Sequence, residues 1–208
     1  MKDYSQHGEQ AHILKFFDGF KGRFLDIGAF DGITGSNTRA LVELGWTGVC
    51  IEASPLVFRE LVKNAKHTVS CCNAAVMDSA GLVKFYDNDG QCGTCLDNQD
   101  LERVVPTQRT YWVGAITPKM IADTFGGHFD FISLDIEGMD LNVLREFEPV
   151  AEHTRLLCFE DSIPCHKFDP KYYDQMIFKS AALDLTQIIF RSGDTIGGGN
   201  TLIARKNT

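Results

Sequence analysis

The chain has 208 residues, a formal net charge of −8, 44% hydrophobic residues and 23% charged residues. This length suits one globular domain over residues 1–208, and the acidic balance argues against a nucleic-acid partner, because phosphate binding needs basic residues. No apolar run approaches the roughly 18 residues that cross a bilayer, and the first residues lack the order of a signal peptide. We therefore expect a cytoplasmic protein without a membrane span.

Short apolar runs alternate with amphipathic stretches along the chain. The pattern predicts strands at residues 22–27, 47–51, 69–76, 82–86, 129–134 and 154–159, and helices at 36–44, 55–63, 117–124, 139–147 and 172–183. Two final runs, 185–190 and 201–204, flank a glycine-rich turn and predict an antiparallel hairpin. This alternation is typical of a doubly wound α/β domain with a mostly parallel sheet and helices on both faces.

The stretch from residue 87 to residue 111 is rich in Asp, Asn, Gly and Gln and shows little periodicity. It predicts a long loop, and we interpret residues 91–111 as a lid or substrate loop. Cys92 and Cys95 form a single C-x-x-C pair without the second pair of a zinc site, so we interpret them as unpaired loop cysteines. Tyr111 and Trp112 either stack on a sugar ring or anchor the loop.

A glycine turn follows the first predicted strand. In the sequence FLDIGAFDG, Gly28 and Gly32 allow the backbone to turn sharply and to approach a ligand. Glu52 ends the next predicted strand, where an acid can accept hydrogen bonds from both hydroxyls of a ribose. Together these motifs predict a site for a cofactor that contains adenosine.

The charges near this turn favour one cofactor. A nicotinamide enzyme needs G-x-G-x-x-G and a place for pyrophosphate, whereas Asp31 brings negative charge there. S-adenosylmethionine has no phosphate and carries an ammonium and a sulfonium, so acidic residues favour it. An NAD-dependent oxidoreductase of Rossmann type and a non-catalytic donor-binding protein are the alternatives.

The chain resembles the FkbM-type methyltransferase family at several motifs. The matching residues are Ser5-Gln6 with Gly8-Glu9-Gln10, residues 26–32 (DIGAFDG), Ser36-Asn37-Thr38, Gly45-Trp46, residues 50–55 (CIEASP), Asn73-Ala74-Ala75-Val76 and residues 132–140 (ISLDIEGMD). The resemblance implies a Rossmann-like class I methyltransferase fold with a seven-stranded sheet. It also implies O-methylation of a hydroxyl on a sugar or a small natural-product-like substrate.

The same motifs supply the candidate cofactor-binding residues. The resemblance implies donor contacts at Gly28, Ala29, Asn37, Glu52 and Ala53, with Asn73 and Ala74 near the adenine. The other candidates belong to the same motifs: Asp26, Phe30, Asp31, Ser36 and Asp135.

Three further residues are candidates for catalysis. Asp135 ends a predicted strand beside the expected methionine part of the donor, where it either holds the ammonium or accepts a proton from the acceptor hydroxyl. Glu137 is the second candidate, and for both acids the alternative is a helix start whose dipole favours negative charge. His166 is the third, as a general base, because imidazole titrates near neutral pH; a surface histidine is the commoner outcome.

Glu160 and Asp161 follow the next apolar run, so their carboxylates could converge with Asp135 at one edge of the sheet. Three acids with few basic neighbours would form an oxygen site for Mg²⁺, although a solvated strand end is commoner. We therefore expect S-adenosylmethionine as cofactor, with Mg²⁺ as an alternative addition, and a small hydroxylated molecule, sugars included, as substrate. The sequence leaves a homo-oligomer open.

Overall fold

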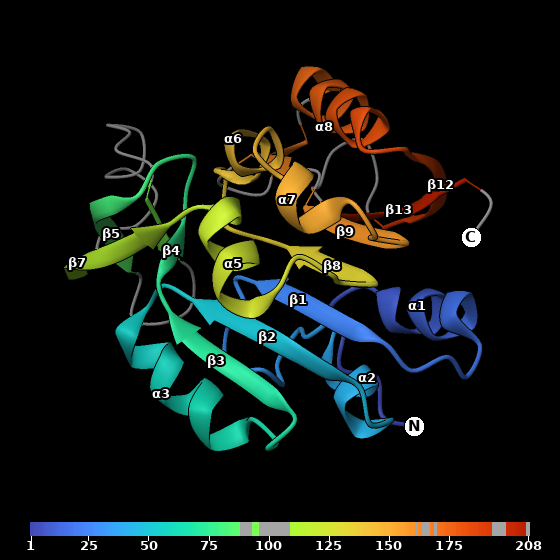
Figure 1. Ribbon diagram of the computed structural model, residues 1–208, viewed down its shortest axis with the longest axis horizontal. Coiled ribbons are helices and arrows are strands. Elements are labelled where there is room, and N and C mark those ends of the chain that lie inside the picture. Colours follow the sequence, from blue (N-terminus) through green and yellow to red (C-terminus); the bar gives the residue numbers. More distant parts are fainter. Residues whose placement is uncertain are drawn as a thin grey trace.

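The computed structural model describes residues 1–87, 93–95, 109–160, 162–163, 167–168, 170–192 and 199–206. A seven-stranded sheet runs through the centre in the order β12-β13-β9-β8-β1-β2-β3 (Figure 1). Its strands are β1 (Arg23–Ile27), β2 (Thr47–Glu52), β3 (Val69–Asn73), β8 (Phe131–Leu134), β9 (Leu156–Glu160), β12 (Leu185–Arg191) and β13 (Asn200–Arg205). Pairs β1–β2, β1–β8, β2–β3 and β8–β9 are parallel. The predicted mostly parallel, seven-stranded sheet is confirmed.

The predicted hairpin at the carboxyl end of the chain is confirmed, with one refinement. Strand β13 pairs antiparallel with both β12 and β9. The last strand therefore lies inside the sheet, and β12 forms its edge. All five residues of β13 before Arg205 are buried, because this strand has a neighbour on each side and helices over both faces.

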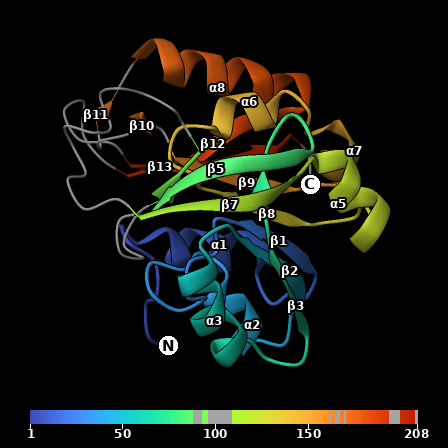
Figure 2. The ribbon, with the colours of Figure 1, turned by 90° about the vertical axis from the view of Figure 1, so that its left-hand side faces the viewer.

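Helices cover both faces of the sheet (Figure 2). One face carries α1 (Glu9–Phe17), α2 (Arg39–Glu43) and α3 (Pro55–Asn64); the other carries α5 (Pro118–Phe125), α6 (Asp140–Leu144), α7 (Glu148–Ala151) and α8 (Pro170–Ala182). Neighbouring residues of a strand point to opposite faces. Phe24 accordingly packs with α1–α3, and Leu25 packs with the helices of the other face.

Capping residues start two of these helices where the sequence predicts them. The Ser54 hydroxyl accepts a hydrogen bond from the backbone N–H of Val57, and the Thr117 hydroxyl accepts one from Met120. A proline follows each cap, where its missing N–H costs nothing. Among the described residues, no helix is both long and apolar enough to cross a membrane.

A second sheet of four strands lies beside the carboxyl end of β3. It consists of β4 (Ala75–Val76), β5 (Gly81–Asp87), β6 (Gly93–Thr94) and β7 (Arg109–Ile116), in the order β4-β7-β5-β6. A separate two-stranded sheet pairs β10 (Ser162–Ile163) with β11 (Lys167–Phe168). The chain thus adds a small sheet to the large one between β3 and α5.

Two predicted elements differ from the structure in this region. The single strand predicted at 69–76 is divided, because Ala74 turns the chain from β3 of the large sheet into β4 of the small one. The predicted loop ends earlier than Tyr111, since β7 begins at Arg109 and pairs with β5. In β7, Val113 and Ala115 are buried while Trp112 is exposed. This alternation of buried and exposed residues is short and follows a polar segment, so the sequence did not indicate a strand here.

Candidate functional site

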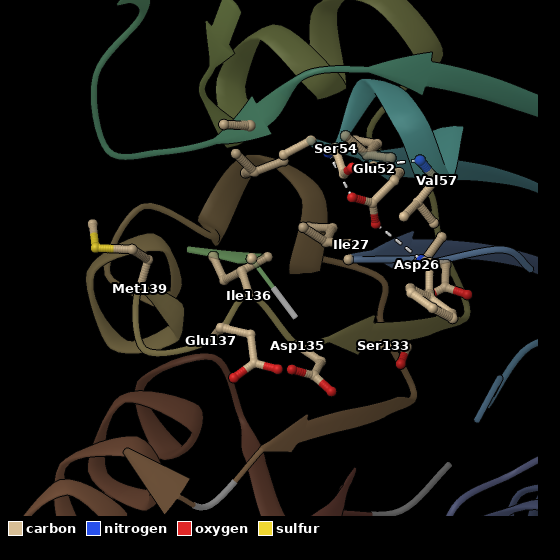
Figure 3. Close-up of a pocket in the computed structure, with 18 of the residues that line it drawn as sticks. Asp26, Ile27, Glu52, Ser54, Val57, Ser133, Asp135, Ile136, Glu137 and Met139 are labelled. Atoms are coloured by element: carbon tan, nitrogen blue, oxygen red, sulfur yellow. Dashed lines mark hydrogen bonds between the residues drawn. The ribbon is translucent and has the colours of Figure 1, made fainter. Parts of the chain in front are cut away.

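A cavity of about 330 Å³ opens at the carboxyl ends of the parallel strands (Figure 3). Its wall includes the turn after β1, Glu52 at the end of β2, Ala74 after β3, and Asp135 after β8. The small sheet closes another side with Phe85 of β5. Ligands of open α/β sheets bind at this edge, and the volume suits a small molecule.

Gly28 allows the ends of β1 and β8 to approach each other. Its φ angle is 82°, and a Cβ atom at this position would lie 1.7 Å from the backbone oxygen of Asp135. The Gly28 N–H donates to the Ile51 carbonyl at 2.9 Å, and the Asp135 N–H donates to the Ile27 carbonyl at 3.0 Å. Glycine is therefore the residue that fits at this turn, as the sequence indicates.

Glu52 is held by backbone donors and remains able to bind more. One carboxylate oxygen accepts a hydrogen bond from Phe30 N at 3.0 Å, and the other accepts one from Ser54 N at 2.7 Å. Burial raises the pKa of Glu52 to about 7, and the nearby charge of Asp87 also raises it. Because each carboxylate oxygen can accept two hydrogen bonds, Glu52 can still accept hydroxyl donors from a ligand.

Buried and half-buried acids gather around the end of β8. Asp135 and Glu137 lie together in the wall of the cavity (Figure 3). Burial raises the pKa of Asp135 well above its usual value, and the charges of Glu137, Asp140 and Asp26 raise it further. Burial also raises the pKa values of Asp26 and Asp140 to about 6. None of the described residues that form the wall is Lys, Arg or His, so a cationic ligand would relieve this repulsion.

Asn37 lines the same cavity and has a buried acceptor atom. Its Nδ2 atom donates to Ser133 Oγ at 3.3 Å and to Cys158 Sγ at 3.5 Å. Its Oδ1 atom is buried and has no hydrogen-bond partner within the part of the chain that the structure describes. A buried acceptor without a partner costs about 1–3 kcal/mol, so an N–H donor of a ligand would be stabilised here.

Most of the residues that the sequence indicates for the site lie in the wall of the cavity. They are Asp26, Gly28, Ala29, Phe30, Ser36, Asn37, Glu52, Ala53, Ala74, Asp135 and Glu137.

Asp31 and Asn73 lie outside this wall and support it. The Asp31 carboxylate accepts hydrogen bonds from Ile33 N at 2.8 Å and from Thr34 N at 2.7 Å, which closes the turn. The Asn73 amide donates to the carbonyls of Glu52 and Ala53 and so holds the backbone after β2.

Several candidates remain untested by the structure. His166, Asp161 and Cys92 lie outside the described residues. Glu160 is buried at the end of β9 and does not line the cavity. Within the described ranges, no group of three or more His, Cys, Asp or Glu side chains could hold a metal ion, so the described part of the predicted Mg²⁺ site has no geometric support.

The cavity wall also contains residues that the sequence did not indicate as candidates for binding or catalysis, although Gln6, Ser54 and Ser133 lie within the motifs quoted above. Gln6, Ser54, Phe85, Asp87 and Ser133 all line it. The Ser54 hydroxyl donates to the Asp87 carboxylate at 2.5 Å and so connects α3 to the small sheet. Asp87 follows the predicted strand 82–86, and an acid at a strand end was a usable signal. Cys95 lines the cavity too, and burial raises the pKa of its thiol to about 11, which keeps it neutral.

Comparisons with known proteins agree with this fold. Solved structures with a similar fold include the ribosomal protein L11 methylase from Lactobacillus delbrueckii subsp. bulgaricus. It is 14% identical, with a TM-score of 0.52, and the superposition covers 96% of this chain and 78% of the methylase chain. Magnesium protoporphyrin IX methyltransferase (ChlM) from Synechocystis PCC 6803, with bound SAM, is 8% identical, with a TM-score of 0.53 and coverage of 95% and 76%. The Methanococcus jannaschii fibrillarin pre-rRNA processing protein is 12% identical, with a TM-score of 0.51 and coverage of 90% and 68%.

At these identities the likeness shows the fold, which is the Rossmann-like fold of class I methyltransferases. No curated protein matches the chain. The family model described as the methyltransferase FkbM domain matches residues 26–159. This match covers more than half of the chain, from the end of β1 through Glu52 and Asp135 to β9, and the chain therefore belongs to the FkbM methyltransferase domain family.

Proposed function

We propose that the chain is an S-adenosylmethionine-dependent O-methyltransferase that acts on a hydroxyl of a sugar or a small natural-product-like molecule. The observation that carries this proposal is the cavity wall, which combines Glu52, Asp135 and other acids without any described basic side chain. A dinucleotide would place a pyrophosphate beside these carboxylates, where like charges repel. A ligand with a ribose, an ammonium and a sulfonium fits them.

Each part of the donor has candidate contacts in the wall. Glu52 would accept hydrogen bonds from the ribose hydroxyls, since its two oxygens keep free lone pairs. Asn37 Oδ1 and the Asp135 carboxylate would hold the ammonium. Ala74 and Phe85 would pack against the adenine from the side of the small sheet.

When bound, S-adenosylmethionine supplies an electrophilic methyl group on sulfur. A neutral hydroxyl must lose its proton as its oxygen bonds to that methyl group, so a carboxylate nearby helps. Asp135 and Glu137 are acids of the cavity wall placed for this task. Asp135 has one of these two roles, holding the ammonium or accepting the proton, because a carboxylate paired with the ammonium would lose the raised pKa that favours proton acceptance. His166 remains the other candidate base.

The same wall supports the choice of a small acceptor. Nucleic acid binding depends on Lys and Arg contacts to phosphates, and the described wall has neither. The acids of the wall would repel the phosphates of a nucleic acid, whereas they would not repel an uncharged hydroxyl compound. Fibrillarin and ChlM, named above, act on other kinds of molecule, so the acceptor class rests on the charge of this cavity and on the family resemblance.

The first test is calorimetric titration of the purified chain with S-adenosylhomocysteine and, separately, with NADH. We expect micromolar affinity for S-adenosylhomocysteine and no heat from NADH. Binding of NADH alone would overturn the proposal in favour of an oxidoreductase. A screen of hydroxylated sugars with a methyl-labelled donor, with and without Mg²⁺, then separates an enzyme from a non-catalytic donor-binding protein, which would bind the donor and turn over no acceptor.

A further inference from the structure

The acidic cavity poses a problem for one part of the proposed donor. S-adenosylmethionine carries an α-carboxylate next to its ammonium, and this anion would lie among Asp26, Asp135 and Glu137. Lys, Arg and His are absent from the described wall, so no described cation can offset the repulsion. The carboxylate therefore needs neutral hydrogen-bond donors.

Few donors in the wall are available for this role. Gln6 and Asn37 are the described wall residues whose side chains carry N–H groups. The Asn37 amide nitrogen already donates to Ser133 and Cys158. Two of the hydroxyls are also used, since Thr34 donates to Asp31 and Ser54 donates to Asp87.

Gln6 differs from Asn37 in that its amide is available. The side chain lines the cavity, and its residue is exposed to solvent. No hydrogen bond connects its amide to another residue in the described ranges of the chain. Its two N–H groups can therefore turn to a ligand at the cost of displacing water.

The backbone near Gln6 places the amide close to the ammonium-binding residues. Ser5 forms a parallel bridge with Gly35, two residues before Asn37. A Cβ atom at position 35 would lie 2.9 Å from Gln6 Cγ and 3.1 Å from Gln6 Nε2, and the φ angle of Gly35 is 66°. The glycine thus lets the Gln6 side chain lie directly over the loop that carries Asn37. The ammonium and the carboxylate of an amino acid share one carbon atom, so their binding residues must be neighbours.

Buried contacts hold this amino-terminal segment in place. Glu9 is fully buried; its Oε1 atom accepts a hydrogen bond from Asn200 Nδ2 at 3.0 Å, and its Oε2 atom accepts one from His7 N at 2.8 Å. Gln10 is buried as well and accepts a hydrogen bond from Tyr4 N at 3.0 Å. Gln6 lies between Tyr4 and His7, whose backbone N–H groups are held by these contacts, so the backbone position of Gln6 is set before a ligand binds.

We infer that Gln6 binds the α-carboxylate of the methyl donor through its side-chain amide and thereby selects ligands that carry this group. The inference rests on the proposed function, because it assumes the donor occupies this cavity. It assigns the amino-terminal segment a part in donor recognition, although the segment precedes the matched residues 26–159.

The test compares two ligands that differ only in the carboxylate: S-adenosylhomocysteine and its decarboxylated analogue, S-adenosyl-3-thiopropylamine. Calorimetry gives both dissociation constants for the wild type and for Gln6→Ala. We expect Gln6→Ala to weaken S-adenosylhomocysteine about tenfold, the effect of one charge-assisted hydrogen bond at a partly exposed site, and to change the analogue less than twofold. Gln6→Glu should weaken S-adenosylhomocysteine further and strengthen the analogue, whose ammonium it attracts.

Gln187→Ala is the matched control, because Gln187 is an exposed glutamine of β12 outside the cavity. It should change neither constant. Equal affinities of Gln6→Ala and the wild type for S-adenosylhomocysteine, or equal weakening of both ligands, would overturn the role of Gln6 and leave the donor site intact. A wild-type protein that binds neither ligand would instead overturn the donor site, and the role of Gln6 with it.

Discussion

Charged side chains have opposite surroundings at the two ends of the parallel strands, which form two opposite edges of the large sheet. At the edge where the parallel strands begin, Arg205 donates from Nε to the Thr154 carbonyl and from Nη2 to the Ala151 carbonyl, both at 2.9 Å. Arg23 reaches the carbonyl of Phe125, and Arg155 lies over the ring of Phe20. At the edge where these strands end, the buried Asp26 and the half-buried Asp135 have raised pKa values.

The arginines stabilise the fold, whereas the carboxyls lie where we propose that the donor binds. The arginines donate hydrogen bonds to backbone carbonyls or lie over an aromatic ring. These contacts form when the chain folds, so they stabilise the folded state. The carboxyls lose hydration and repel one another, so their ionised forms are destabilised, and a cationic ligand would offset this cost. Substitutions at the two edges should therefore separate stability from donor affinity.

The largest expected effect comes from Gly28→Ala. The added Cβ would meet the backbone oxygen of Asp135, and the φ angle of 82° strains any other residue. We expect a loss of about 3 kcal/mol or more in the free energy of unfolding, together with the loss of donor binding. Urea denaturation measures the first and calorimetry the second. Gly114→Ala is the control, because nothing lies within 4 Å of its Cβ position; a Gly28→Ala protein as stable as this control would contradict the tight turn.

The next effect concerns pH and Glu52. Its pKa in the folded protein is about 7, above its usual value of 4.5, so the folded state binds the proton more tightly. Its contribution to stability is present below pH 4.5 and is lost as the pH rises through about 7, which amounts to at most about 3 kcal/mol. Glu52→Gln should therefore make the ligand-free protein more stable than the wild type at pH 8, and similar to it near pH 4.5.

Urea denaturation of both proteins between pH 4.5 and pH 8 measures this difference. Glu60→Gln, at an exposed glutamate of α3, serves as the control and should follow the wild type. Parallel curves for Glu52→Gln and the wild type would show that Glu52 titrates like an exposed glutamate.

Asp135→Asn should separate function from stability most clearly. The substitution removes a half-buried carboxyl that Glu137, Asp140 and Asp26 repel, so we expect no loss of stability at pH 7.5. Affinity for S-adenosylhomocysteine should fall about ten- to a hundredfold, because the ammonium loses a charged partner. Turnover, once an acceptor is known, should fall further. Asp123→Asn, on the exposed side of α5, is the control; unchanged affinity for Asp135→Asn would remove Asp135 from the donor site.

The smallest effect is expected at the opposite edge. Arg205→Ala removes hydrogen bonds to the carbonyls of Thr154 and Ala151 and should lower the free energy of unfolding by about 1–2 kcal/mol. Donor affinity should stay within twofold of the wild type. Lys206→Ala, at an exposed neighbour, should change neither quantity. Loss of donor affinity without loss of stability in Arg205→Ala would contradict the assignment of stability to one edge and of donor binding to the other.

The local patterns of the sequence predicted most of the large sheet and several residues of the cavity wall. Apolar runs of strand length identified every strand of that sheet, to within a few residues at the ends. The turn at Gly28 and the acid Glu52 after the second strand both follow from residue chemistry at known spacing, and both line the cavity.

The small sheet was harder to predict from sequence. Strand β7 pairs with β5 across a segment of polar composition, and its alternation is short. Ala74 ends one strand and begins the path to another sheet, a change of direction that an unbroken apolar run from 69 to 76 does not reveal. Pairing with a distant strand, rather than local preference, decided both outcomes.

Sequence alone therefore determined the parallel strands, the glycine turn and the spaced acid, because hydrophobic periodicity and turn chemistry are local properties of the chain. Tertiary structure decided which side chains share the cavity. Gln6, Asp87 and Asp135 come from three distant segments, and only the order of the strands brings them to one edge. The raised pKa values were decided there too, because burial and repulsion between carboxyls depend on distances that no local pattern encodes.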